Sequence, residues 1–150
     1  MNSVTVRNQQ RKFPVHSPAV RQAAELLIND LLELQNCELA IHFVNETRMA
    51  DLNHTHLQHE GPTDIITFDY STSTQVHGEL VICPAVAAEN AKQYGASLGR
   101  EYARYLVHGV LHIIGHDDRK PAQRRKMKAK ENALLRKLAR RLPLDSLAHG

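Results

Sequence analysis

Residues 108–118 read His-Gly-Val-Leu-His-Ile-Ile-Gly-His-Asp-Asp and place two histidines four positions apart. On a helix, side chains at positions i and i+4 lie one above the other, so His108 and His112 can direct two imidazoles at one metal ion. Gly115 can adopt the positive φ that ends a helix, after which the chain could turn back and bring Asp118 to the same ion. Three protein ligands with an open fourth position are typical of a catalytic zinc site.

The expected helix around these histidines is apolar on almost every side, which indicates that it is buried. Burying two imidazoles there costs free energy unless hydrogen bonds or a shared metal satisfy them. A buried histidine that only forms hydrogen bonds would give the same pattern, and His116 competes with Asp118 as the third ligand. The apolar residues are Tyr102, Ala103, Leu106, Val107, Val110, Leu111, Ile113 and Ile114.

The motif resembles the signature of the YbeY family of bacterial endoribonucleases, which act in ribosomal RNA maturation and ribosome quality control. A second block is also similar to that family, with Pro-Thr-Asp-Ile-Ile-Thr-Phe at 62–68 followed by Gly-Glu-Leu-Val-Ile at 78–82. The resemblance covers roughly residues 38–118. It implies a third ligand at the position of Asp118, where the family usually has a histidine, and we therefore favour Asp118 over His116.

The resemblance implies an α+β fold with a small mixed sheet, about five helices and a zincin-like metal site on a buried helix. Strands mingled with helices, without a regular βαβ alternation, also favour the α+β class. The implied activity is that of a single-strand-specific, metal-dependent endoribonuclease, a hydrolase that matures the 3′ end of 16S rRNA in the cytoplasm. Zn²⁺ is the expected cofactor, and a carboxylate ligand also suits other divalent metals. The catalytic residues are unassigned.

The resemblance implies rRNA and ribosomal subunit precursors as partners, with ribosomal proteins and GTPases as further candidates. Binding to DNA or to a membrane is not expected.

One departure from the family weakens the nuclease assignment. The family has a Tyr-Arg pair before its Pro-Thr block, and its arginine matters for activity, whereas His56 and Leu57 stand at these positions here. The alternative function is therefore an RNA-binding ribosome-assembly factor with a structural metal and little or no nuclease activity.

Zinc proteases also carry two helical histidines at this spacing, and their general base is the glutamate directly after the first histidine. Gly109 stands at that position, which argues against peptide hydrolysis. Thr63 and Asp64 are candidates either to cap the strand that follows them or to hold a ligand imidazole by its free N–H. Glu79 is expected either beside the site or on the surface.

The composition is that of one globular domain spanning residues 1–150, with 42% hydrophobic and 23% charged residues. Residues 1–13 are polar and basic, which predicts no signal peptide, and no run approaches the roughly 18 apolar residues of a membrane span. Cys37 and Cys83 form no C-x-x-C pair and are interpreted as free thiols of a reducing cytosol.

Positive charge is concentrated at the C-terminal end. Residues 1–118 contain 8 Lys and Arg against 14 Asp and Glu, whereas residues 119–150 contain 11 against 2. A helix is expected at about 121–142, and cations in its first turns oppose the helix dipole. They form either a solubilising surface or a site for an RNA backbone, because aromatic residues for base stacking are scarce. The candidate RNA-binding residues are Arg124, Arg125, Lys126, Lys128 and Lys130.

Periodicity and turn residues predict the remaining elements. Ser17 is the expected N-cap of the first helix, with Pro18 as its first residue. Strands are expected at 4–9, 39–44, 65–70 and 79–83, and helices at 18–34, 46–57, 84–94 and 99–114.

Overall fold

The computed structural model describes residues 1–57 and 63–149, except for the side chain of Leu57. Its described strands form one sheet in which three neighbouring strands are parallel and the edge strand is antiparallel. The predicted mixed sheet and α+β class are confirmed. In sheet order the strands are β1 (Ser3–Asn8), β2 (Cys37–Phe43), β4 (Val76–Ile82) and β3 (Ile65–Asp69).

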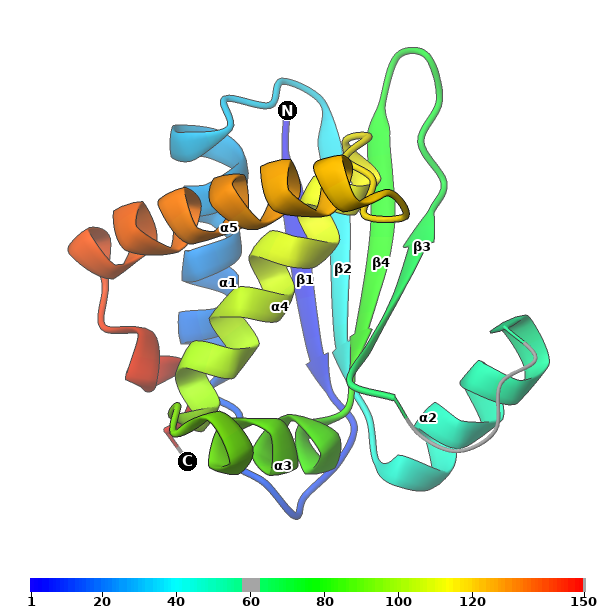
Figure 1. Ribbon diagram of the computed structural model, residues 1–150, viewed down its shortest axis with the longest axis vertical. Helices are drawn as coiled ribbons and strands as arrows, with labels where there is room; N and C mark the ends of the chain where they lie inside the picture. The colour runs from blue at the N-terminus through cyan, green and yellow to red at the C-terminus, as the bar shows by residue number, and fades with distance from the viewer. Residues whose placement is uncertain (58–62, 150) are drawn as a thin grey trace.

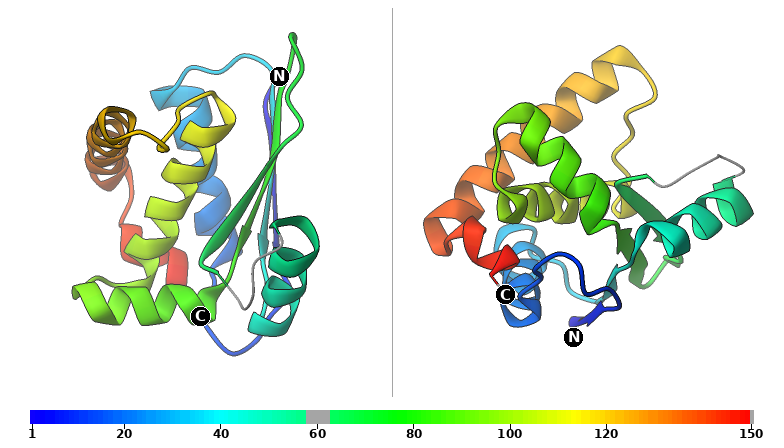
Figure 2. Two further views of the ribbon diagram at one scale, coloured as in Figure 1. Left: turned by 45° about the vertical axis from the view of Figure 1, so that its right-hand side comes forward. Right: turned by 90° about the horizontal axis from the view of Figure 1, so that it is seen from below.

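Most of the helices lie on one face of this sheet (Figures 1 and 2). α1 and α4 pack against that face, and α5 crosses α4 on the side away from the sheet. α3 lies across one end of α4, whereas α2 lies on the opposite side of the sheet. The helices of the described residues are α1 (Ser17–Glu25), α2 (Glu46–Leu52), α3 (Pro84–Tyr94), α4 (Leu98–Ile113) and α5 (Pro121–Arg141).

Short segments of other helix types extend this frame. π-helical turns continue α1 (η1, Leu26–Leu31) and α2 (η2, Asn53–Leu57), and a 3₁₀ segment (η3, Leu144–Ala148) packs on α4. Within the described part of the chain, no helix combines the length and hydrophobicity that a bilayer crossing would demand.

The N-cap predicted for α1 is wrong by one residue. Ser17 is already the first helical residue, and the cap is His16, whose Nδ1 accepts a hydrogen bond from the backbone N–H of Ala19 at 3.3 Å. The physical reason is that an imidazole nitrogen can satisfy an unpaired N–H of the first turn as a serine hydroxyl does. Pro18, which has no N–H to satisfy, is accommodated at the second position of the helix.

α4 is the most buried helix of the fold. The side chain of Ser97 caps its first turn by accepting a hydrogen bond from the N–H of Arg100 at 3.2 Å. Its central residues contact the sheet closely, because a Cβ at Gly109 would lie 2.5 Å from a methyl carbon of Leu80 on β4. Leu80 is fully buried and has little freedom to move away. Any larger residue at position 109 would therefore force the side chain of Leu80 to shift.

We predict that Gly109→Ala destabilises the protein by up to about 2 kcal/mol, because the gain of about 1 kcal/mol that alanine normally brings to a helix interior offsets only part of an overpacking cost of about 1–3 kcal/mol. Urea unfolding of the variant and the wild type measures the difference. The double variant Gly109→Ala/Leu80→Ala is the control, since removing the Leu80 methyl groups makes room for the new Cβ. Strictly additive effects of the two substitutions would contradict the packing explanation.

Candidate metal centre

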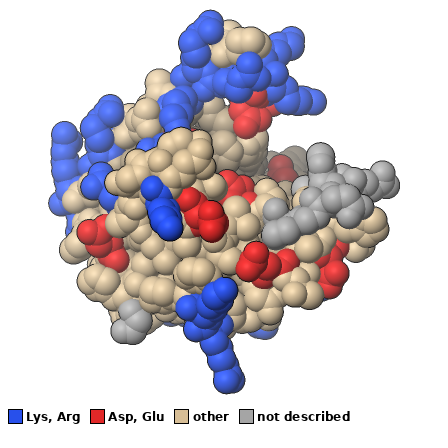
Figure 3. Space-filling view, turned by 60° about the horizontal axis from the view of Figure 1, so that its bottom comes forward, with Lys and Arg blue, Asp and Glu red and all other residues tan. Residues whose placement is uncertain are grey.

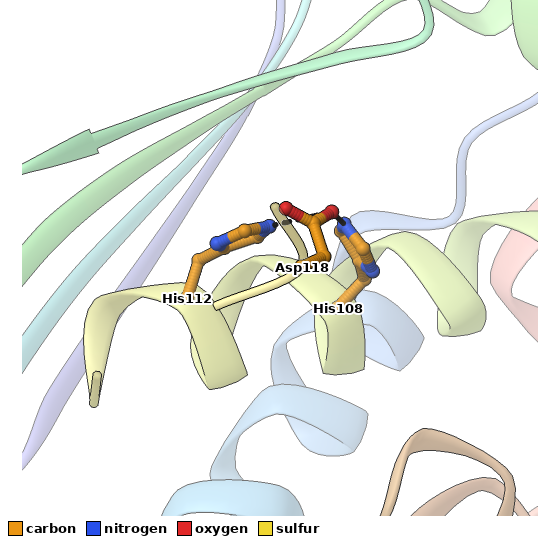
Figure 4. A group of neighbouring side chains, drawn as sticks. All are labelled: His108, His112 and Asp118. Atoms are coloured by element: carbon orange, nitrogen blue, oxygen red, sulfur yellow. Dashed lines mark ion pairs between the residues drawn. The ribbon is translucent and has the colours of Figure 1, made fainter. Parts of the chain in front are cut away.

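The last turns of α4 bring two imidazoles beneath a carboxylate of the following loop (Figure 4). Nε2 of His112 lies 3.5 Å from Oδ2 of Asp118, and Nε2 of His108 lies 3.9 Å from the same oxygen. One potential ligand atom from each residue lies within 4.8 Å of the other two. Among the described residues, no other group of His, Cys, Asp and Glu reaches this geometry.

The three side chains fit a divalent metal ion. A tetrahedral ion with ligand bonds of about 2.0–2.2 Å separates its ligand atoms by roughly 3.3–3.6 Å. The observed separations of 3.5 and 3.9 Å approach these values. Two imidazole nitrogens and one carboxylate oxygen are donors that zinc accepts, and the partial exposure of all three leaves room for a further ligand.

The turn after α4 is built by Gly115, as the sequence predicts. Its φ is 105°, a conformation that favours glycine. The N–H of His116 donates to the carbonyl of Leu111 at 2.9 Å, and the N–H of Gly115 donates to that of His112 at 3.1 Å. These two hydrogen bonds form a Schellman motif, which ends the helix and turns the chain toward Asp118.

Neighbouring arginines hold the loop in this position. Arg119 binds Asp117 through Nη2 at 2.7 Å, and this hydrogen-bonded pairing lowers the pKa of Asp117 to about 2. Nη1 of Arg124 donates to the backbone carbonyls of Asp118 and Arg119 at 3.3 and 3.2 Å. Asp117 is thereby turned to Arg119, and Asp118 is the carboxylate that faces the imidazoles.

His116, the competing third ligand, does not join the group of His108, His112 and Asp118. Burial, with the positive charges of Lys130 and Lys126, lowers the pKa of the His116 imidazole. The ligand set remains a prediction, with the geometry in favour of Asp118.

Sequence reasoning missed Glu131, a buried carboxylate on α5. Its Oε2 lies 3.0 Å from Nδ1 of His108, and its Oε1 accepts a hydrogen bond from Nη1 of Arg104 at 2.6 Å. Burial alone would raise the pKa of Glu131, but the hydrogen bonds from His108 and Arg104 outweigh it and lower that pKa. A carboxylate on Nδ1 keeps the proton there and turns the Nε2 lone pair toward Asp118.

For Asp64 and Glu79, the sequence left two alternatives each, and the structure favours the one away from the metal site. Oδ1 of Asp64 accepts a hydrogen bond from the N–H of Ile65 at 2.8 Å, so Asp64 caps the start of β3. Glu79 pairs with His42 at 3.1 Å and alternates along β4 with Gly78 and Leu80, which face α4, so it points to the opposite face of the sheet.

A sequence signal for Glu131 did exist, because this charged residue interrupts the apolar stripe of α5 four positions after Met127.

The predicted RNA-binding cations divide between two sides of α5. Arg124, Arg125 and Lys128 line a cavity of about 420 Å³ together with His108 and Asp118, among others, whereas Lys126 and Lys130 do not line it. In the space-filling view, Lys and Arg side chains gather at the top and along the left edge, and the surface is hollowed below the upper group (Figure 3). Leu57, at the position of the family arginine, has its side chain outside the described residues.

Comparisons with known proteins agree on one family. The family model "Endoribonuclease YbeY" matches residues 5–139. An Endoribonuclease YbeY from Chlorobium luteolum is 38% identical over 103 residues, covering 69% of this chain and 75% of the relative. One from Aquifex aeolicus is 31% identical over 145 residues, covering 94% and 95%. The solution structure of TM1509 from Thermotoga maritima has a TM-score of 0.69 over 95% of each chain at 19% identity, which supports the fold.

We predict that Asp118→Ala abolishes stoichiometric zinc binding, because it removes one of three converging ligands, whereas His116→Ala binds zinc like the wild type. Metal content after dialysis against a weak chelator measures both. Retention of one zinc per chain by Asp118→Ala, with its loss from His116→Ala, would reverse the ligand assignment.

We predict that Glu131→Gln lowers zinc affinity by about 10- to 100-fold, the usual effect of removing a group that orients a ligand imidazole. Competition with a chromophoric chelator gives the dissociation constant. Glu89→Gln, which alters an exposed carboxylate of α3, serves as the matched control. Equal zinc affinities of the two variants would show that Glu131 does not orient His108.

Proposed function

The chain belongs to the Endoribonuclease YbeY family, and on this basis we propose that it is a metal-dependent endoribonuclease that cleaves single-stranded RNA. We assign it to the cytoplasm, to maturation of the 3′ end of 16S rRNA and to ribosome quality control, acting as one domain over residues 1–150. Its partners in this role are ribosomal subunit precursors, with ribosomal proteins or GTPases as further candidates.

The observation that carries this proposal is the position of the three-ligand cluster at the wall of a cavity that is lined by cations. His108 and Asp118 border that cavity together with Arg124, Arg125 and Lys128. Structural zinc sites are usually closed by four protein ligands, whereas catalytic sites keep one position open. Cations beside an open position suit a phosphodiester substrate, because they pair with phosphate oxygens.

Each side chain has a defined task in this proposal. His108, His112 and Asp118 hold the metal, for which Zn²⁺ is the first candidate and other divalent ions are compatible. When bound, such an ion supplies Lewis acidity toward a phosphoryl oxygen or lowers the pKa of a water. Glu131 keeps His108 in the tautomer whose Nε2 faces the site. The cations at the start of α5, Arg124, Arg125, Lys126, Lys128 and Lys130, attract and position the RNA backbone.

Leu57 stands where the family has an arginine, so this position provides no cation for the scissile phosphate. Arg125 and Lys128 line the site cavity and can supply that charge from α5. Nζ of Lys128 is 3.9 Å from Oε1 of Glu131, but its exposed side chain keeps its ammonium accessible to a phosphate. Arg124 is less suited, because its guanidinium is hydrogen-bonded to the loop carbonyls of Asp118 and Arg119. We therefore assign the phosphate-binding role to Arg125 and Lys128.

We predict that purified wild-type protein cleaves a single-stranded RNA and that His112→Ala, prepared identically, loses at least about 100-fold in rate, since metal and catalysis are lost together. Gel analysis of an end-labelled RNA measures both proteins, and thermal unfolding verifies that the variant is folded. Equal cleavage by the two proteins would contradict chemistry at this metal site. Absence of cleavage by both, with RNA binding retained, would favour the ribosome-assembly factor.

A further inference from the structure

A second and larger cavity lies along the same helices, one turn of α4 before the metal site. It has a volume of about 750 Å³ and is bordered by residues of α3, α4 and α5. Its charged lining consists of Arg100, Arg104, Lys128 and Arg136, with Asp64 and Glu101 as the acidic members. Lys128 also lines the metal-site cavity, so the two cavities adjoin at this side chain.

One row of side chains on α5 connects the two cavities. Arg124, Lys128, Asn132 and Arg136 follow each other at i+4 spacing, and each lines one cavity or both. Residues at this spacing share a helix face, and the row extends over about 18 Å along the axis. Lys137 and Arg140 lie on the same helix but line neither cavity. We call the two adjoining cavities together the groove. Of the cations on α5, only some therefore line this groove.

The cations of this groove differ in their availability. Arg104 is bound to Glu131 and to Oδ1 of Asn132, at 2.6 and 3.2 Å. Among the described residues, neither Arg100 nor Arg136 takes part in an ion pair. The guanidinium groups of these two residues are therefore available to phosphate oxygens on a bound strand.

The far end of the cavity also offers an aromatic ring. Tyr94, the last residue of α3, lines the cavity and is 75% exposed. An exposed ring of this size beside arginines is suited to stacking on a nucleobase, which is a sequence-tolerant contact. Two amides, Asn90 and Asn132, line the same cavity; Asn90 donates to the hydroxyl of Tyr105 at 3.1 Å, and Asn132 accepts from Arg104.

We propose that this second cavity holds the single-stranded RNA that adjoins the scissile phosphate, with Arg100 and Arg136 on its phosphates and Tyr94 stacked on a base. The inference rests on the proposed function, because the strand is taken to continue from the metal site past Lys128. The cavity then makes the enzyme prefer strands long enough to reach it. Recognition through backbone and stacking contacts leaves the base sequence largely unread.

The first test compares two double variants of equal charge. Arg100→Ala/Arg136→Ala removes one cation of α4 and one of α5 that line the second cavity, and Lys137→Ala/Arg140→Ala removes two cations of α5 that line neither cavity. Fluorescence anisotropy with a labelled 2′-O-methyl decanucleotide, over a salt series, gives the dissociation constants. We expect the groove variant to bind about tenfold more weakly and to lower the salt slope by about 1.4, since each contact to a single strand contributes roughly 0.7. Equal losses in the two variants would overturn the proposal.

The second test uses the aromatic ring and the length of the strand. Tyr94→Ala should weaken decanucleotide binding by about tenfold, whereas Tyr94→Phe, which keeps the ring, should bind like the wild type. A trinucleotide confined to the metal site should be bound equally by wild type, Tyr94→Ala and the groove variant. A loss for the trinucleotide as large as that for the decanucleotide would contradict an extended strand site.

The two proposals can fail separately. If the wild type cleaves RNA but the groove variants bind and cleave the decanucleotide normally, the nuclease assignment stands and the strand site is wrong. If the groove variants lose affinity while the wild type cleaves no RNA, the strand site stands and the nuclease assignment is wrong. Absence of any RNA binding by the wild type would overturn both.

Discussion

The buried carboxylate of Glu131 joins α5 to α4 at the metal centre, because it binds both Arg104 and His108 from the inner side of α5. A charge among apolar side chains is costly unless it is paired and hydrogen-bonded, and Glu131 has both kinds of partner. The same contact orients one imidazole and lies on the buried face of α5, beside Met127, Leu134 and Leu138. Glu131 thus links the ligand geometry to the helix face whose packing leaves the cations of α5 outside.

Local signals in the sequence were sufficient for much of this architecture. Pro84 and Gly95 bound α3, and Gly115 ends α4, because each of these residues has a backbone preference that acts without tertiary context. The i+4 spacing of His108 and His112 likewise predicts two imidazoles on one face. The details that were missed depend on contacts across the fold. Glu131 reaches His108 over 23 positions in sequence, and no spacing rule connects two helices whose packing is unknown.

The small number of aromatic residues favours RNA recognition through the backbone. The structure adds one exposed ring, Tyr94, in the lining of the second cavity, which only the fold could place there. The charge pattern of α5 is a second feature that points to RNA. Its first turn contains no acidic residue, and cations there oppose the helix dipole. The N-terminal end of α5 therefore lacks the negative charge that normally stabilises a helix start, and the phosphates of a nucleic acid carry charge of that sign.

The packing of Gly109 against Leu80 has a consequence for how this fold can change during evolution. A metal motif on a helix could become that of a zinc protease by gaining a glutamate after its first histidine. Here any side chain at that position would meet a fully buried leucine. A mutation that introduced the glutamate would impair folding before it could offer a new activity, and a prior change in the sheet would be needed. The packing of β4 against α4 thus keeps this metal motif from changing into that of a zinc protease, although the two motifs differ at a single position.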